Sequence, residues 1–165
     1  PLTIKENAEF VLSQIPEEEK LSRVIVSMSL GSMVAVEMGQ KAPEKFLKIF
    51  VMNPSFANLS PFYHRLQLTA FKRFITIGRS KSLFDREIEV IRMVSQKTEK
   101  HEEVAKLWTQ IAEDRPMPVK NFFRQLMAAA TYRVADDPPD VPIVILNSEK
   151  DEMVHPSCSE EFADH

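Results

Sequence analysis

The sequence predicts an α/β fold of three layers, in which a mostly parallel sheet lies between helices and carries a helical cap insertion. Three observations lead to this prediction. Short runs rich in β-branched and apolar residues occur at 23–28, 46–53 and 143–148, and helix-like periodicity follows the first and the third. A long helical stretch separates the second run from the third. Strands that alternate with helices in this way are typical of parallel sheets.

The first part of the predicted core spans residues 1–53. Thr3 and Glu6 have the spacing of a capping box, and one apolar face then continues to Ile15. A polar break follows, then the first strand, a helix from residue 30 to about 42 that stops before Pro43, and the second strand. Strand, helix and strand with short links predict a βαβ unit with parallel strands and a right-handed crossover.

The rest of the chain divides into a cap at 54–139 and a second part of the core at 140–165. The cap shows four segments with helical periodicity, at 71–77, 83–96, 102–112 and 119–133, and no convincing strand. The turn-rich stretch DDPPDVP leads into the third strand. A last helix is expected to begin near Pro156.

Composition narrows the class of protein. The chain has 165 residues, a net charge of −3 and 44% hydrophobic residues, which suits one globular domain. Basic and acidic residues are interspersed, so we expect no nucleic-acid partner. No apolar run approaches the ~20 residues that a membrane-spanning helix needs. The single cysteine, Cys158, fits a reducing compartment, and we expect a cytoplasmic protein without a metal site.

The sequence Ser27-Met28-Ser29-Leu30-Gly31 joins the first strand to the helix that follows it. A catalytic serine requires exposure and nearby N–H donors, and a sharp strand-to-helix turn with small residues on either side supplies both. Ser27 and Gly31 are the small residues here, and the N–H of Leu30 would be an oxyanion donor. The alternative interpretation is a capping serine at an ordinary turn, and this short match alone leaves both open.

A carboxylate follows the third strand. Asp151 lies in the loop after that strand, and parallel-sheet sites gather beyond the carboxyl ends of strands, so Asp151 and Ser29 can face one cleft. Serine before aspartate is also the chain order of one known triad arrangement. This pairing favours the interpretation of Ser29 as a nucleophile.

Together, SMSLGSMVA, APEKFLKIFVMNPS and VPIVILNSEKDEMVHPSCSEEFA resemble the C-terminal part of an α/β hydrolase, with the middle of the chain as its variable cap. The resemblance implies that Ser29 is the nucleophile, that Asp151 orients a histidine and that Leu30 supplies an oxyanion N–H. Some members carry the acid after the preceding strand, where this chain has Asn53, which cannot act as a carboxylate. Members with an aspartate nucleophile, such as haloalkane dehalogenases, are disfavoured by Ser29.

The chain also departs from the family pattern. The family's histidine follows a further strand, whereas this sequence ends at His165, where it still reads as a helix. We therefore expect the catalytic histidine, the second oxyanion donor and the early strands to lie outside this chain, with the remaining segments of the same protein as its partner. His155 is interpreted as a loop residue. Alone, the chain is expected to be inactive and its fold incomplete.

The resemblance implies a serine hydrolase that cleaves a carboxylic ester or related acyl bond without a cofactor. The substrate is expected to be a small, apolar acyl compound that contacts Ser27, Met28, Asn53 and His64. The alternative interpretation of His64 is a solvated histidine of the cap. Phenylalanines and methionines of the cap either line an acyl pocket or pack the cap on the core. Two alternatives stay open: an acyltransferase on the same fold, and a non-catalytic binding protein of this fold.

Overall fold

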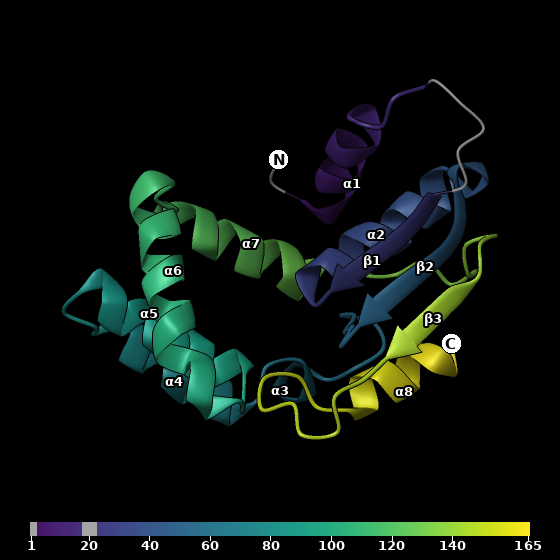
Figure 1. The fold of residues 1–165 in the computed structure, drawn as a ribbon. Coiled ribbons are helices and arrows are strands. Elements are labelled where there is room, and N and C mark those ends of the chain that lie inside the picture. The colour runs from purple at the N-terminus through teal and green to yellow at the C-terminus, as the bar shows by residue number, and fades with distance from the viewer. Residues whose placement is uncertain (1–2, 18–22) are drawn as a thin grey trace.

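The computed structural model describes residues 3–17 and 23–165, and these form one parallel sheet of three strands. The strands β1 (Arg23–Met28), β2 (Phe46–Met52) and β3 (Ile143–Leu146) lie in that order, and both neighbouring pairs are parallel. The predicted α/β class and the parallel βαβ unit are therefore confirmed. The arrowheads in Figure 1 show that the carboxyl ends of all three strands meet at one edge of the sheet.

Two helices accompany the first strands. The helix α1 (Ile4–Ser13) begins at the predicted capping box, where Thr3 and Glu6 exchange hydrogen bonds of 2.9 and 3.1 Å. The helix α2 (Leu30–Lys41) starts directly after β1 and ends before the 3-10 turn η1 (Pro43–Lys45). The two helices pack on each other, and Lys41 pairs with Glu9 at 2.9 Å. Of the predicted polar break, residues 18–22 lie outside the described residues.

The two faces of the sheet differ. Ile25, Ile49 and Ile143 share one row of the register, and this row lies on the face that α2 covers. Gly39 of α2 permits the close approach, because a Cβ there would lie 2.7 Å from the Ile49 side chain. On the opposite face of β1, Val24, Val26 and Met28 are exposed. The described helices thus leave that face of β1 open.

The cap consists of helices between β2 and β3. They are α3 (Phe62–Arg65), α4 (Leu68–Gly78), α5 (Leu83–Val94), the 3-10 turn η2 (Thr98–Lys100), α6 (His101–Asp114) and α7 (Val119–Thr131). The four predicted helical segments are confirmed, and residues 54–139, all of them described, contain no strand. Figure 1 shows the cap extending away from the sheet and returning along α7 toward α2. The division of the chain at residues 54 and 139 remains a prediction.

Aromatic packing joins the returning cap to the core. Phe56 is fully buried. The centroid of its ring lies 4.5 Å from that of Phe162 in α8 (Ser157–Ala163) and 6.0 Å from that of Tyr132. The Tyr132 hydroxyl donates a hydrogen bond of 2.9 Å to the buried Glu37 carboxylate of α2. Burial raises the pKa of Tyr132, and the bond to Glu37 raises it further. None of the helices in the described ranges is long and apolar enough to cross a bilayer.

Candidate active site

The turn between β1 and α2 has a strained backbone at Ser29. Its φ of 53° and ψ of −122° lie outside the regions that an L-residue normally adopts. Such a conformation costs about 1–3 kcal/mol and is concentrated at functional sites. The flanking small residues lie close to each other, since a Cβ on Gly31 would be at ordinary contact distance, 4.0 Å, from that of Ser27. The sequence pattern S-x-S-x-G thus coincides with a sharp strand-to-helix turn.

Hydrogen bonds from β2 hold this turn in place. The Ser29 N–H donates to the Met52 carbonyl at 2.9 Å, and the buried Ser32 hydroxyl donates to the same carbonyl at 3.1 Å. The Ser29 hydroxyl does not cap the helix, so it stays available. Among the described residues, the first-turn N–H of Leu30 has no acceptor, which leaves it free for an anion at the positive end of α2.

The end of β2 repeats this construction. Asn53 is the other described non-glycine residue with a positive φ, at 47°, and its N–H donates to the Leu146 carbonyl of β3 at 3.0 Å. Its side chain reaches across to the loop after β3. The Asn53 amide donates to Asp151 at 2.6 Å, and its carbonyl oxygen accepts the Ser148 N–H at 2.9 Å. Asn53 therefore links the β1–β2 edge to the predicted acid.

Asp151 is fixed from three sides. Its Oδ1 accepts the N–H groups of Met153 and Val154 at 2.7 and 3.1 Å, and its Oδ2 accepts the Asn53 amide. An ionised carboxylate has about four lone-pair sites, so Oδ2 retains capacity for one more donor, such as an imidazole N–H. From the cap, Gln67 Nε2 holds the Asp151 backbone carbonyl at 2.8 Å.

The remaining predicted substrate contacts lie in different settings. The Ser27 hydroxyl is engaged within the sheet, where it donates to the Phe50 carbonyl at 2.9 Å. The Met28 side chain is exposed on the open face of β1 together with Val24 and Val26. His64 lies in α3, against the loop that carries Asp151. The described hydrogen bonds bring Asn53 and Asp151 together, and they join Ser29 to this pair only through the backbone at Met52.

A second serine–histidine cluster was not predicted. The rings of His64 and His155 stack with centroids 4.7 Å apart, and Ser157 Oγ lies 3.1 and 2.9 Å from their Nδ1 atoms. The Ser157 N–H donates to His155 Nδ1, which is therefore an acceptor. His64 and Ser157 are 93 positions apart in the sequence, so no local pattern indicates their contact. The only local signal was the spacing His155-x-Ser157. His155 is a loop residue, as expected.

Other reactive groups are set apart. Cys158 is fully buried, and burial raises the pKa of its thiol. His165 Nε2 lies 2.9 Å from the Ala135 carbonyl. Within the described ranges, no three His, Cys, Asp or Glu side chains gather as metal ligands. Two hollows of the surface lie on the cap, one between α4 and α5 and one along η2 and α6.

Known structures share this fold. MGS-M2, an α/β-hydrolase enzyme from a Medee basin deep-sea metagenome library, matches with a TM-score of 0.64 at 17% identity over 99% of this chain. BpoC of Mycobacterium tuberculosis H37Rv, assigned as a non-heme bromoperoxidase, matches with a TM-score of 0.60 at 18% identity over 98% of this chain. The matches cover 60% and 61% of those two chains. At 17–18% identity, these matches show that the fold is similar and do not indicate a shared activity.

The sequence comparison is more specific. The chain matches no curated protein. A family profile described as serine aminopeptidase, S33, matches residues 3–165, which is nearly the whole chain and includes Ser29, Asn53 and Asp151. The resemblance to the α/β hydrolases is thereby confirmed at both the level of fold and the level of family. The chain belongs to the serine aminopeptidase S33 family of α/β hydrolases.

Proposed function

We propose that the protein is a serine hydrolase in which Ser29 attacks the acyl carbon of an ester or related small substrate. The observation that carries this proposal is the φ of 53° at Ser29. A serine that merely caps a helix has an extended backbone and accepts a helix N–H through its hydroxyl, whereas Ser29 does neither. Strain at a serine whose hydroxyl is left free is what a nucleophile elbow requires.

The proposed reaction proceeds in two steps. Ser29 Oγ bonds to the acyl carbon while a histidine takes its proton, and the Leu30 N–H stabilises the oxyanion that forms. The histidine then protonates the leaving group, and water hydrolyses the acyl-enzyme by the reverse sequence of proton transfers. Asp151 accepts the other N–H of that imidazole and stabilises its positive charge. No cofactor takes part.

We assign the base to a histidine outside this chain. Among the described residues, no hydrogen bond joins an imidazole to Ser29 or to Asp151, and His64 and His155 are engaged with Ser157. By this proposal, the 165-residue chain alone has no turnover. We also propose a cytoplasmic location, which suits a chain whose single cysteine is unpaired.

Labelling with a fluorophosphonate probe tests the nucleophile. The protein is expressed from its complete reading frame, labelled and mapped by peptide mass spectrometry. We expect the label on Ser29, and we expect Ser29→Ala to abolish it while the matched variant Ser157→Ala retains it. A folded protein that takes no label, or takes it on Ser157, would contradict the proposal and would favour a non-catalytic binding protein or the second cluster.

The bond that is cleaved requires a separate measurement. The family profile is described by an aminopeptidase, whereas we propose an ester or related acyl bond. Parallel assays with p-nitrophenyl butyrate and with aminoacyl p-nitroanilides distinguish the two, and an added alcohol acceptor reports acyl transfer. We expect faster release of nitrophenol from the ester, and a clear preference for the anilide would contradict this part.

A further inference from the structure

The cap carries two helical faces of large apolar side chains that no described residue covers. In α4 they are Leu68, Phe71 and Ile75, spaced i, i+3 and i+7, so that they share one face of the helix. In α7 they are Val119, Phe123 and Met127, spaced i, i+4 and i+8. Monomeric proteins seldom leave large apolar side chains in such contiguous groups. We name these six residues the cap stripe.

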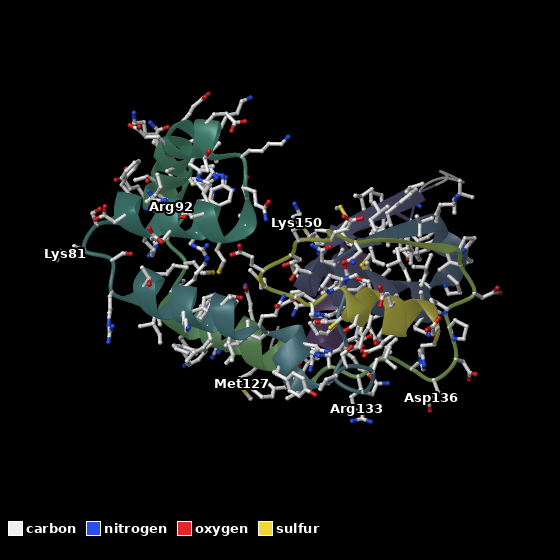
Figure 2. All side chains as sticks on the ribbon, turned by 90° about the horizontal axis from the view of Figure 1, so that it is seen from below. Lys81, Arg92, Met127, Arg133, Asp136 and Lys150 are labelled. Carbon is white, nitrogen blue, oxygen red and sulfur yellow. The ribbon has the colours of Figure 1, made fainter. Side chains whose placement is uncertain are left out.

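The two halves of the cap stripe belong to neighbouring helices. The rings of Phe74 in α4 and Phe122 in α7 pack with their centroids 5.7 Å apart. The Phe122 centroid lies 5.6 Å from that of Phe123. Arg65, just before α4, also donates to the Ala129 and Ala130 carbonyls of α7. In Figure 2, Met127 lies on the side of the cap opposite Arg92 of α5 and away from Lys150 of the acid loop.

The charge around the cap stripe has one sign. Residues 65–84 and 115–135, which contain α4 and α7, include nine lysines and arginines and no aspartate or glutamate. Lys72 and Arg79 follow the apolar face of α4, and Lys120 and Arg124 follow that of α7, all four exposed. In the described part of the chain these four side chains form no ion pair. The intervening residues 85–114 carry eight acidic and five basic residues, so the asymmetry belongs to α4 and α7.

We propose that the cap stripe docks on the surface of a bilayer that contains anionic phospholipids. Large apolar side chains flanked by lysine and arginine are the pattern of helices that lie in a membrane interface. The apolar residues enter the boundary between headgroups and acyl chains, and the basic residues contact anionic headgroups. A second copy of the same surface fits less well, because it would oppose basic residues with basic residues. This proposal does not depend on the nucleophile or on the cleaved bond.

Vesicle flotation of the protein expressed from its complete reading frame tests the proposal. We expect flotation with vesicles of phosphatidylcholine and phosphatidylglycerol, at least about tenfold weaker association with phosphatidylcholine alone, and release at high salt. Equal association with both kinds of vesicle, or none with either, would overturn the proposal. Sedimentation of the same protein without vesicles tests the alternative, in which a second copy covers the cap stripe. A stable dimer that is dissociated by Phe71→Ser and Met127→Ser would assign the cap stripe to that second copy.

Matched variants locate the surface. The double variant Phe71→Ser with Met127→Ser is expected to lower association about tenfold or more. The control is Leu107→Ser with Ile111→Ser on α6, where the two side chains are 55% and 52% exposed, close to the 56% and 61% of Phe71 and Met127. An equal loss in the control would overturn the assignment to α4 and α7. Circular dichroism verifies that each variant is folded.

Charge reversal gives an independent measurement that leaves the apolar residues in place. Lys72→Glu with Lys120→Glu is expected to remove most of the preference for anionic vesicles, about tenfold, since each basic residue near such a surface contributes to binding. The control is Lys100→Glu of η2 with Lys106→Glu of α6, which we expect to keep the preference. An unchanged preference in the first variant would contradict the role of the basic residues.

Discussion

The sheet edge and the cap are stabilised in different ways. At the carboxyl edge of the sheet, Ser29 and Asn53 have positive φ, and hydrogen bonds from residues far along the chain hold both of them. In the cap, helices pack side by side through apolar contacts such as Phe74 with Phe122, and several apolar faces stay exposed. The edge thus has a geometry that few sequences satisfy, whereas the cap accepts many apolar sequences. By our proposals, the chemistry takes place at the sheet edge and the membrane is recognised by the cap.

The two regions nevertheless touch at the acid loop. Thr69 donates to the Glu152 carbonyl at 2.7 Å, Arg73 pairs with the Glu152 carboxylate at 3.1 Å, and Gln96 donates to the Lys150 carbonyl at 3.3 Å. Helix α4 and the segment just after α5 therefore reach the same loop that carries Asp151. Movement of this part of the cap would displace the loop of Asp151 before it displaced Ser29, because Ser29 is hydrogen-bonded to β2.

The largest expected effect is on the acid. Asp151→Asn in the protein expressed from its complete reading frame should lower kcat/KM by about three to four orders of magnitude, because the charge that stabilises the imidazolium is lost. Steady-state hydrolysis of the preferred ester measures this. The matched control is Glu149→Gln, an exposed carboxyl on the same loop, which should change activity little. Similar losses in both variants would contradict the assignment of Asp151.

Asn53 separates backbone strain from side-chain support. Asn53→Gly and Asn53→Ala both remove the 2.6 Å bond to Asp151 and should lower kcat about tenfold to a hundredfold with little change in KM, because the acid is less well positioned. Glycine tolerates the positive φ and alanine does not, so the alanine variant should unfold more easily by about 1 kcal/mol. Steady-state kinetics measures the change in kcat, and urea unfolding measures the change in the free energy of unfolding. Full activity in Asn53→Gly would show that the bond does not support the acid.

Two glycines contrast core and cap directly. Gly39→Ala should destabilise the chain by about 1–3 kcal/mol, because the new Cβ meets Ile49 at 2.7 Å and Val141 at 3.1 Å in a packed interior. Gly78→Ala in α4 meets nothing within 4 Å and should stabilise it by up to about 1 kcal/mol through helix propensity. Urea unfolding measures both. Equal effects would mean that the sheet and α2 are packed no more tightly than the cap.

Another small expected effect concerns the contact between α7 and α2. Tyr132→Phe leaves the buried Glu37 without its hydroxyl donor and should destabilise the chain by about 1–2 kcal/mol at neutral pH. Because the pKa of Tyr132 is raised on folding, its contribution is present below the ordinary tyrosine value of about 10 and falls as the pH rises above it.

Urea unfolding between neutral and alkaline pH measures this dependence. The wild-type chain should lose more stability above pH ~10 than Tyr132→Phe does. Tyr63→Phe, which changes an exposed tyrosine of α3, is the matched control and should behave as the wild type. Parallel curves for the wild type and Tyr132→Phe would contradict the role of burial.

Periodicity in the sequence was sufficient for most elements. It predicted β1 at its observed bounds, the parallel pairing with β2 and the helices of the cap, because these depend on spacing within one segment. The bond between Asn53 and Asp151 joins positions 98 apart, and no local pattern indicates it. Asn53 combines a positive φ with an N–H bond to β3, and a sequence pattern reveals neither of them. For the same reason Ser157 between two imidazoles was missed.

The bonds that hold Ser29 and Asn53 also set the order in which the site can be completed during synthesis. The N–H of Ser29 needs the carbonyl of Met52, the N–H of Asn53 needs that of Leu146, and Asp151 needs the N–H of Val154. Each requirement lies later in the chain than the one before. A ribosome releases these partners from the N-terminal side onward, so of these three residues Asp151 is fixed last, after the whole cap has emerged. By our proposal, the nascent protein thus carries its nucleophile long before the acid is in place.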